Sequence, residues 1–375
     1  MGMTLFIYGP LCIPVMMQIV AGCRPVEEPA RLEGYRVAPR QPDGVPLLVQ
    51  APGATAEGLL LRDVSEEIAD RIAHYADAHG LEPVSMLVEG PAGPLRALAF
   101  RGEPGQWPVA AGNWSAESWA AAGGEEACHA AHEVMKLRGR YAGEALRFRL
   151  NQIRARAAAR VTALHETVPH VLGRGPSDPW VEEIGQRDDH AGWFFTRTYD
   201  LRHQSFAGRP SPQIRREVLL APDAAILLPY DPLRDRVLLV EQFRMGPYAR
   251  GEALPWMLEP VAGRVDPGET AAQCARREAR EEAGLDLHDL LPVAKCYPTP
   301  GCSTEFYHCF VGLCDLPETA PGRGGLAEED EDIRTHVLPF DRAMEMLSSG
   351  EARNAPLILS LLWLASKRSE LRGAA

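Results

Sequence analysis

A short acidic segment constrains this chain more than any other feature. Residues 263–285 read GRVDPGETAAQCARREAREEAGL. On a helix, Glu278 and Glu282 share one face and Glu281 lies beside them, because residues three and four apart are neighbours. Like charges at that spacing weaken a free helix by roughly 0.2–0.5 kcal/mol per pair, so the cluster is explained if a cation occupies the face. Carboxylate oxygens are hard ligands that suit Mg²⁺ or Mn²⁺, and the segment therefore predicts a divalent-metal site.

Two glycines and an ion pair frame this segment. Gly263 permits a tight turn into the loop, and Gly284 suits the left-handed residue that follows a helix. Arg277 and Glu269 carry opposite charges and can pair, which would brace the loop against the helix. Taken alone, glutamates at helical spacing are more often a solvated surface, so the complete spacing has to decide between the two interpretations.

The complete spacing resembles the Nudix box, G-x5-E-x7-R-E-U-x-E-E-x-G-U, at every fixed position, and Ala279 stands at the first aliphatic site. Seven fixed letters, each at about one in fifteen by ordinary composition, match by chance on the order of once in 10⁸ starting points. The resemblance implies a hydrolase in which divalent metals neutralise a pyrophosphate and activate the water that attacks phosphorus. It also implies an α+β fold, the Nudix α/β/α sandwich with a mixed sheet.

From about Trp193 onward, the chain is similar to the ADP-ribose pyrophosphatase branch of that family. The matching landmarks are Arg216-Glu217, VEQFR at 240–244, LEPVAG at 258–263, TPG at 299–301 with Glu305, EEDEDI at 328–333 and NAP at 354–356. The resemblance implies Mg²⁺-dependent hydrolysis of ADP-ribose to AMP and ribose 5-phosphate. The alternatives are a GDP-mannose or other nucleotide-sugar pyrophosphatase and, in another class, a sensor that binds a nucleotide sugar without turnover. The intact carboxylates argue against the sensor, because binding alone needs no water-activating group.

By the same resemblance, the metal is Mg²⁺, with Mn²⁺ as the alternative, and its ligands are the Ala262 carbonyl, Glu278, Glu282 and Glu331. Glu329 orients or deprotonates the attacking water, with Glu281 and Glu282 completing the catalytic set. Glu328 and Glu331 remain alternatives for the base. The implied substrate contacts are Trp193 and Phe194 around the adenine, Arg216 and Glu217 near it, Arg244 on a phosphate or the terminal ribose, Glu305 on a ribose hydroxyl, and Arg264 and Thr299.

The first half carries a looser resemblance. The opening FIYGPL at 6–11, with RLEGYRV at 31–37 and GLLL at 58–61, resembles gamma-glutamylcyclotransferase-like domains over residues 4–110. Ala76 stands where that family has its acid, with Asp77 next to it, and loss of the acid removes the general acid/base. We therefore expect a domain for binding, dimerisation or support without catalysis. The combination of the two domains resembles a bacterial group associated with tellurite resistance.

Length and charge limit the remaining possibilities. A chain of 375 residues suits at least two domains, and a net charge of −12 disfavours nucleic acid and anionic membranes as partners. The apolar residues 1–23 lack the positive region of a signal peptide, and the eight cysteines contain no C-x-x-C pair, so we expect a cytoplasmic location. The expected partners are a nucleoside diphosphate sugar and, by the resemblance, a second copy in a homodimer.

Hydrophobic periodicity and turn residues give the predicted organisation. The domains are 1–110, cyclotransferase-like; 111–165, a helical extension; 166–187, a linker; and 188–375, the Nudix domain. The predicted helices are 12–21, one from 66, 124–137, 143–164, 270–283, 340–349 and 355–371. The predicted strands are 4–8, 45–49, 57–62, 84–88, 95–101, 192–200, 216–221, 224–230, 236–243, 257–263, 292–297 and 305–314.

Overall fold

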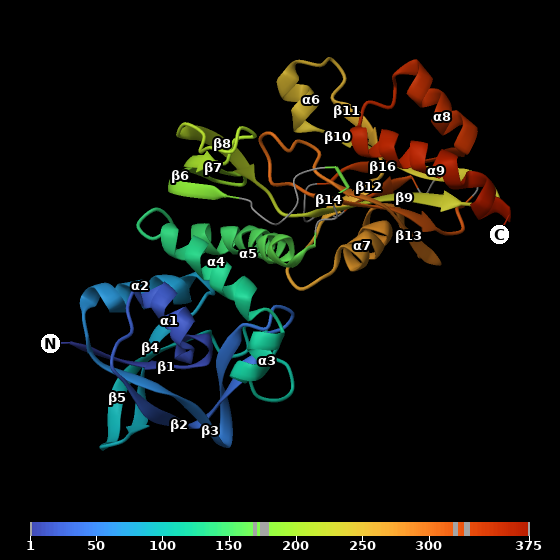
Figure 1. The fold of residues 1–375 in the computed structure, drawn as a ribbon. Helices are drawn as coiled ribbons and strands as arrows, with labels where there is room; N and C mark the ends of the chain where they lie inside the picture. Colours follow the sequence, from blue (N-terminus) through green and yellow to red (C-terminus); the bar gives the residue numbers. More distant parts are fainter. Residues whose placement is uncertain (1, 168–170, 173–179, 318–321, 326–330, 374–375) are drawn as a thin grey trace. The chain divides into compact units, whose positions relative to one another are not determined.

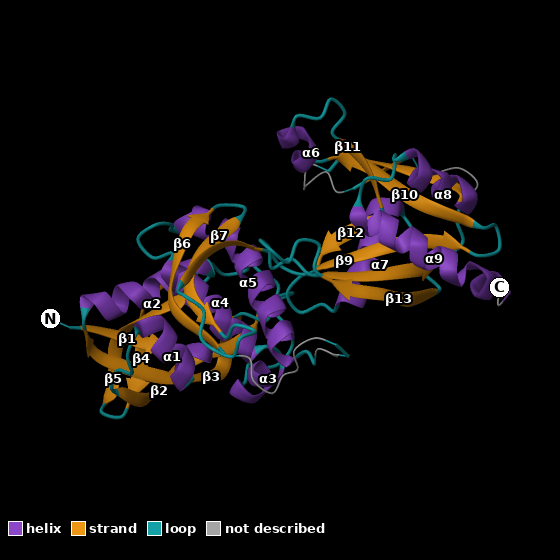
Figure 2. Cartoon of the chain, turned by 45° about the horizontal axis from the view of Figure 1, so that its top comes forward, coloured by secondary structure: helices purple, strands orange, loops and turns teal. Residues whose placement is uncertain are grey.

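The computed structural model describes residues 2–167, 171–172, 180–317, 322–325 and 331–373. The chain folds into two compact units, Met1–Pro169 and His170–Ala375 (Figure 1). The division falls inside the Pro- and Gly-rich segment where the sequence places the domain boundary. Both units combine strands and helices (Figure 2), as expected for an α+β chain.

The first unit contains a closed barrel in the strand order β1-β3-β2-β4-β5. The strands are β1 Met3–Ile7, β2 Glu27–Pro39, β3 Pro46–Val64, β4 Glu82–Gly90 and β5 Gly93–Arg101. Strand β2 was not predicted, and β3 is one strand where the sequence predicted two. Pro52-Gly53 looks like a turn in the sequence, but β3 continues through Gly53 at φ 83° and pairs along β2 past an irregularity at Gly34. Tertiary pairing therefore overrides the local turn signal.

Helices cover one side of this barrel. They are α1 Pro14–Ala21, preceded by a 3₁₀ turn at Gly9–Cys12, and α2 Glu66–Ala78, α3 Ala116–Ala121, α4 Gly124–Lys136 and α5 Gly143–His165. The Ser65 hydroxyl accepts a hydrogen bond from the Ile68 N–H at 3.3 Å and caps α2. Ile72 of α2 and Ala131 of α4 lie in the same core as Leu5 of β1. Helix α4, which lies after residue 111, is thus part of this unit's core.

The second unit contains an eight-stranded mixed sheet in the order β13-β14-β9-β10-β16-β15, with β11 paired to β10 and β12 paired to β9. Its strands are β9 Ala224–Asp231, β10 Arg236–Phe243, β11 Trp256–Glu259, β12 Val261–Arg264, β13 Asp289–Cys296, β14 Tyr307–Leu313, β15 Arg323–Gly324 and β16 Ile333–Pro339. Only β9 and β14 pair in parallel among these described ladders. Its helices are α6 Met245–Arg250, α7 Ala271–Ala283, α8 Phe340–Ser349 and α9 Ala355–Gly373.

The two faces of this sheet carry separate cores. Ala225 and Leu227 of β9 pack with the α7 residue Ala279 on one face. Leu228 and Tyr230 pack with residues of α8 and α9 on the other. Alternate residues of one strand therefore face different helices, as the two-residue period of a strand requires. The result is the three-layer α/β/α sandwich that the sequence predicted.

A separate three-stranded sheet begins the second unit. Its strands are β6 Val181–Ala191, β7 Phe195–His203 and β8 Ile214–Leu220. The predicted linker extended to residue 187, but 181–187 form the first part of β6. Most β6 side chains are exposed, so the strand shows no alternation of apolar and polar residues that sequence reading could detect. No helix in the described part of the chain is both apolar enough and long enough to span a bilayer.

Candidate active site

Local interactions explain why the acidic segment forms α7. The Thr270 hydroxyl accepts from the Gln273 N–H at 3.2 Å, and the Gln273 side chain accepts from the Thr270 N–H at 2.7 Å, which closes a capping box. Gly284 ends the helix in the left-handed region at φ 63°. Ala279 is fully buried against the sheet, so a small residue at the first aliphatic position lets the helix approach closely. The helix predicted at 270–283 is confirmed.

Arg277 braces the loop against this helix. Its guanidinium donates to Glu269 Oε1 at 2.7 Å, to Glu278 Oε1 at 2.6 Å and to Glu281 Oε2 at 2.9 Å. It also donates to the Arg264 carbonyl at 3.1 Å. The predicted Arg277–Glu269 pair is therefore present, and the same charge holds two more carboxylates of the segment. Charge-assisted hydrogen bonds of this kind are among the stronger polar contacts in proteins.

Two carboxylates of α7 lie at the edge of β12, Glu282 buried and Glu278 partly buried. Glu282 is 1% exposed, and its Oε2 accepts from the Ala262 N–H at 3.3 Å. Burial, together with the negative charges of Glu278 and Glu331, raises the pKa of Glu282 to about 9. Burial also raises the pKa of Glu278 to about 7, against the opposing effect of Arg277. Buried carboxylates that repel one another are stabilised by a cation.

The donor set fits a hard divalent cation in its chemistry, since all the groups are oxygens. Among the described residues, no three His, Cys, Asp or Glu side chains are arranged closely enough to hold a metal ion. One reason is the orientation of Glu278, whose carboxylate is paired with Arg277. Glu328, Glu329 and Asp330 lie outside the described residues, so the predicted catalytic base at Glu329 is not placed.

Two glycines allow neighbouring strands to approach α7 closely. A Cβ on Gly263 would occupy the space of the Glu278 carboxylate, and a Cβ on Gly324 would overlap the Glu282 carbonyl. The Gly325 N–H donates to the Glu281 carbonyl at 3.2 Å. Strand β15 is thereby held against α7. Gly263 is needed for this close approach, and the tight turn that the sequence suggested there is wrong, because Gly263 lies inside β12 and pairs with Ala225.

Several predicted substrate residues gather near this cluster. The Arg264 guanidinium lies 5.0 Å from the centroid of the Trp193 ring. Burial raises the pKa of Glu305, while the positive charges of Arg264 and Arg244 act in the opposite direction. The structure therefore brings Trp193, Arg264, Arg244 and Glu305 within electrostatic reach of one another, although their residue numbers span more than half of the second unit.

Other predicted residues have different local roles. The Thr299 carbonyl accepts from the N–H groups of Cys302 and Ser303, so this residue belongs to a turn. Arg216 donates to the Arg215 carbonyl at 2.7 Å. Glu217 is exposed on β8, and Phe194 is 56% exposed. No contact between these four residues and the α7 carboxylates is seen in the described structure.

Sequence reading missed two supporting residues. The Tyr307 hydroxyl donates to Glu305 Oε2 at 3.3 Å. Glu259 is buried and paired with Arg244 at 2.7 Å. The landmark LEPVAG includes Glu259 but assigns it no role, and a tyrosine two residues after Glu305 on a strand is a signal that could have been used.

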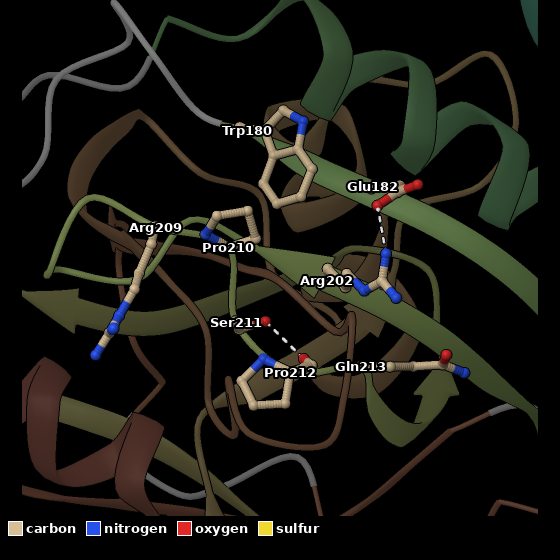
Figure 3. Close-up of a pocket in the computed structure, with 8 residues that line it drawn as sticks. All are labelled: Trp180, Glu182, Arg202, Arg209, Pro210, Ser211, Pro212 and Gln213. Carbon is tan, nitrogen blue, oxygen red and sulfur yellow. Dashed lines mark hydrogen bonds and ion pairs between the residues drawn. The ribbon is translucent and has the colours of Figure 1, made fainter.

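A hollow of about 660 Å³ lies on the three-stranded sheet and is separate from this cluster. Figure 3 shows its lining, Trp180, Glu182, Arg202, Arg209, Pro210, Ser211, Pro212 and Gln213. Arg202 and Glu182 approach to 3.5 Å there. None of the predicted site residues lines it.

Comparison with known proteins agrees with this geometry. The family model described as "NUDIX domain" matches residues 220–361. The chain is 41% identical over 192 residues to the ADP-ribose pyrophosphatase of Escherichia coli (strain K12), covering 51% of this chain and 91% of that protein. It is 35% identical over 194 residues to the ADP-ribose pyrophosphatase of Haemophilus influenzae, covering 51% and 89%.

A third relative carries a different substrate name. The GDP-mannose pyrophosphatase of Salmonella arizonae is 37% identical over 167 residues, covering 44% of this chain and 84% of that protein. The family match begins at residue 220, so it does not bear on the first unit. The complete box is folded into α7, and the alignments with these relatives cover most of the relatives' own length. This chain therefore belongs to the Nudix family of hydrolases.

Proposed function

We propose that this protein hydrolyses the pyrophosphate bond of ADP-ribose, giving AMP and ribose 5-phosphate. The observation that carries the proposal is the pair of carboxylates on α7, the buried Glu282 and the partly buried Glu278, on a helix whose box is complete. The two ADP-ribose pyrophosphatases, at 41% and 35% identity, support this substrate over the alternative. GDP-mannose is the second candidate, because a GDP-mannose pyrophosphatase matches a shorter part of the chain.

The proposed metal is Mg²⁺, held by the Ala262 carbonyl, Glu278, Glu282 and Glu331. Such a cation supplies positive charge to the pyrophosphate and activates water for attack on phosphorus. Glu278 would have to turn from Arg277 to take part, a movement made easier because Arg277 keeps Glu269 and Glu281 as partners. Glu329 is proposed as the group that orients and deprotonates the water.

The proposed substrate contacts follow from the residues gathered beside α7. Arg244 binds a phosphate or the terminal ribose, and Glu305 binds a ribose hydroxyl. Trp193 and Phe194 are 52% and 56% exposed, so each side chain keeps exposed surface for contact with adenine. Arg264 orients Trp193. The proposed set is completed by Thr299 and by the exposed Arg216 and Glu217. Because both rings are open to solvent, we propose a homodimer in which a second copy completes the adenine site.

The first unit is proposed to be cyclotransferase-like and without catalysis, in a cytoplasmic protein of the tellurite-resistance-associated group. Ala76, at the position of the family's acid, is 3% exposed. The adjacent Asp77 already accepts hydrogen bonds from the Gly143 N–H at 2.5 Å and from Arg147 at 2.8 Å. These contacts tie Asp77 to α5, which suits a structural role. Formation of 5-oxoproline from gamma-glutamyl substrates would contradict this part of the proposal.

The substrate is tested with purified full-length protein and a phosphatase that releases phosphate only from the products. We expect kcat/KM to be higher for ADP-ribose than for GDP-mannose, and phosphate release to require Mg²⁺. A higher kcat/KM for GDP-mannose would favour the second candidate. Tight binding of both compounds without phosphate release would favour the sensor.

The metal proposal predicts a pH-dependent change in thermal stability. The pKa values of Glu278 and Glu282 are raised from 4.5 to about 7 and about 9. Between pH 4.5 and about pH 9, the metal-free fold therefore binds more protons than the unfolded chain. The stability of the metal-free fold therefore falls as the pH rises through that window. A cation competes with those protons, so saturating MgCl₂ should raise the melting temperature more at about pH 8.5 than at about pH 6. Equal increases at both pH values, measured by scanning calorimetry, would contradict the proposed ligands.

A further inference from the structure

A buried carboxylate with no role assigned by the sequence lies beside the proposed substrate site. Glu259, the last residue of β11, is 6% exposed. Its Oε2 accepts from Arg244 Nε at 2.7 Å and from Gln242 Nε2 at 3.4 Å, and its Oε1 accepts from Asn354 Nδ2 at 2.6 Å. Both carboxylate oxygens thus have partners, which a buried negative charge requires.

The guanidinium of Arg244 is held by Glu259 through its Nε atom. Its side chain is 40% exposed, whereas that of Glu259 is 8% exposed. The pair is made through Nε, and a guanidinium also carries four N–H donors on its two outer nitrogens. These are the donors that form parallel hydrogen bonds to phosphate oxygens. The positive charge of Arg244 acts on both Glu282 and Glu305, so the side chain lies near both parts of the proposed site.

Asn354 connects this pair to the last helix. Its Oδ1 accepts from the Leu357 N–H at 3.1 Å and caps the first turn of α9, while its amide donates to Glu259. A residue that caps a helix has little freedom to move. The orientation of Arg244 is therefore tied, through Glu259, to the start of α9, although Asn354 lies 95 residues after Glu259 in the sequence.

We propose that Glu259, together with Asn354, is a positioning residue that fixes the Arg244 guanidinium for the pyrophosphate substrate. The inference rests on the proposed function, since it requires Arg244 to bind a substrate oxygen. Holding a long side chain in its binding geometry reduces the conformational entropy that is lost when the substrate binds. Glu259 itself touches no substrate, so its loss should act on binding more than on the chemical step.

The test is a double-mutant cycle read as KM and kcat in the full-length protein. Glu259→Gln keeps the shape of the side chain and removes its charge, so KM for ADP-ribose should rise about tenfold while kcat changes by less than about threefold. In an Arg244→Ala background, Glu259→Gln should change KM by less than about twofold, because the guanidinium that Glu259 holds is already missing. The matched control is Glu252→Gln, which removes a carboxylate paired with Arg353 at 2.6 Å and should leave KM unchanged.

A second variant covers the possibility that Glu259→Gln does not fold. Asn354→Ser keeps an oxygen that can cap α9 and removes the amide donor to Glu259. It should therefore raise KM less than Glu259→Gln does, and this effect on KM should also be lost in the Arg244→Ala background. An unchanged KM, or an equal increase with and without Arg244, would overturn the positioning role. If ADP-ribose is not hydrolysed, the proposed function fails, and the same cycle is read as Kd for ADP-ribose by calorimetry. In that case, an unchanged Kd in Glu259→Gln, or no binding at all, overturns the inference as well.

Discussion

Replacing Glu282 by Gln is expected to lower kcat for ADP-ribose by roughly 10²–10³-fold while the protein keeps its fold. Glu282 is the most buried carboxylate of α7, and its pKa of about 9 means that the metal-free protein holds it protonated at neutral pH. Glutamine resembles that protonated form and can still accept from the Ala262 N–H. The variant therefore removes the negative charge that would attract a cation, without leaving a buried charge unpaired.

The measurement is steady-state hydrolysis of ADP-ribose with MgCl₂, together with thermal melting to verify folding. Asp286→Asn is the control, because Asp286 follows the same helix, pairs with Arg280 at 2.7 Å and has a side chain that is 84% exposed. It should retain kcat within about twofold, as exposed ion pairs contribute little. Normal turnover by Glu282→Gln would show that α7 does not carry the reaction.

The second large effect is expected at Gly263, where Gly263→Ala should reduce kcat/KM at least about 100-fold. The added methyl group would occupy the present position of the Glu278 carboxylate, so that side chain has to leave the edge of β12. The backbone of Gly263 is not in the left-handed region, so alanine introduces no backbone strain there. The loss should therefore exceed what any decrease in stability explains.

Gly246→Ala is the matched control, since a Cβ there meets open space. It should leave kcat/KM within about twofold of the original value. The affinity for Mg²⁺, measured as the dependence of rate on metal concentration, should fall in Gly263→Ala and stay constant in the control. A Gly263→Ala protein with normal metal dependence would mean that Glu278 is not a ligand.

The sequence predicted the reactive helix well because its information is local. The caps at Thr270 and Gly284, the buried Ala279 and the Arg277–Glu269 pair all lie within one segment of the chain. Strands β9 and β10 were also predictable, since they are apolar runs bounded by turn residues, whereas the mixed sheet was implied only by the family resemblance.

Other features depend on distant partners and could not be predicted. Strand β2 joins a barrel whose register is set by β3, and β6 is too exposed to show a hydrophobic period. The Glu259–Asn354 contact joins residues 95 positions apart, so no short pattern contains both. The cyclotransferase-like resemblance of the first unit stays a prediction, as does the placement of the base at Glu329.

The division of β9 between two cores has a consequence for how this protein can vary in length. Deleting one residue inside β9 would turn Leu227 toward α8 and α9 and would shift the pairing of Ala262 with Ile226. A single slip would thus disturb both layers and the backbone beside Glu282 together. Insertions and deletions during evolution should therefore be absent from β9 and confined to surface connections. One such connection is residues 204–213, which join β7 to β8 and contribute no residue to either core.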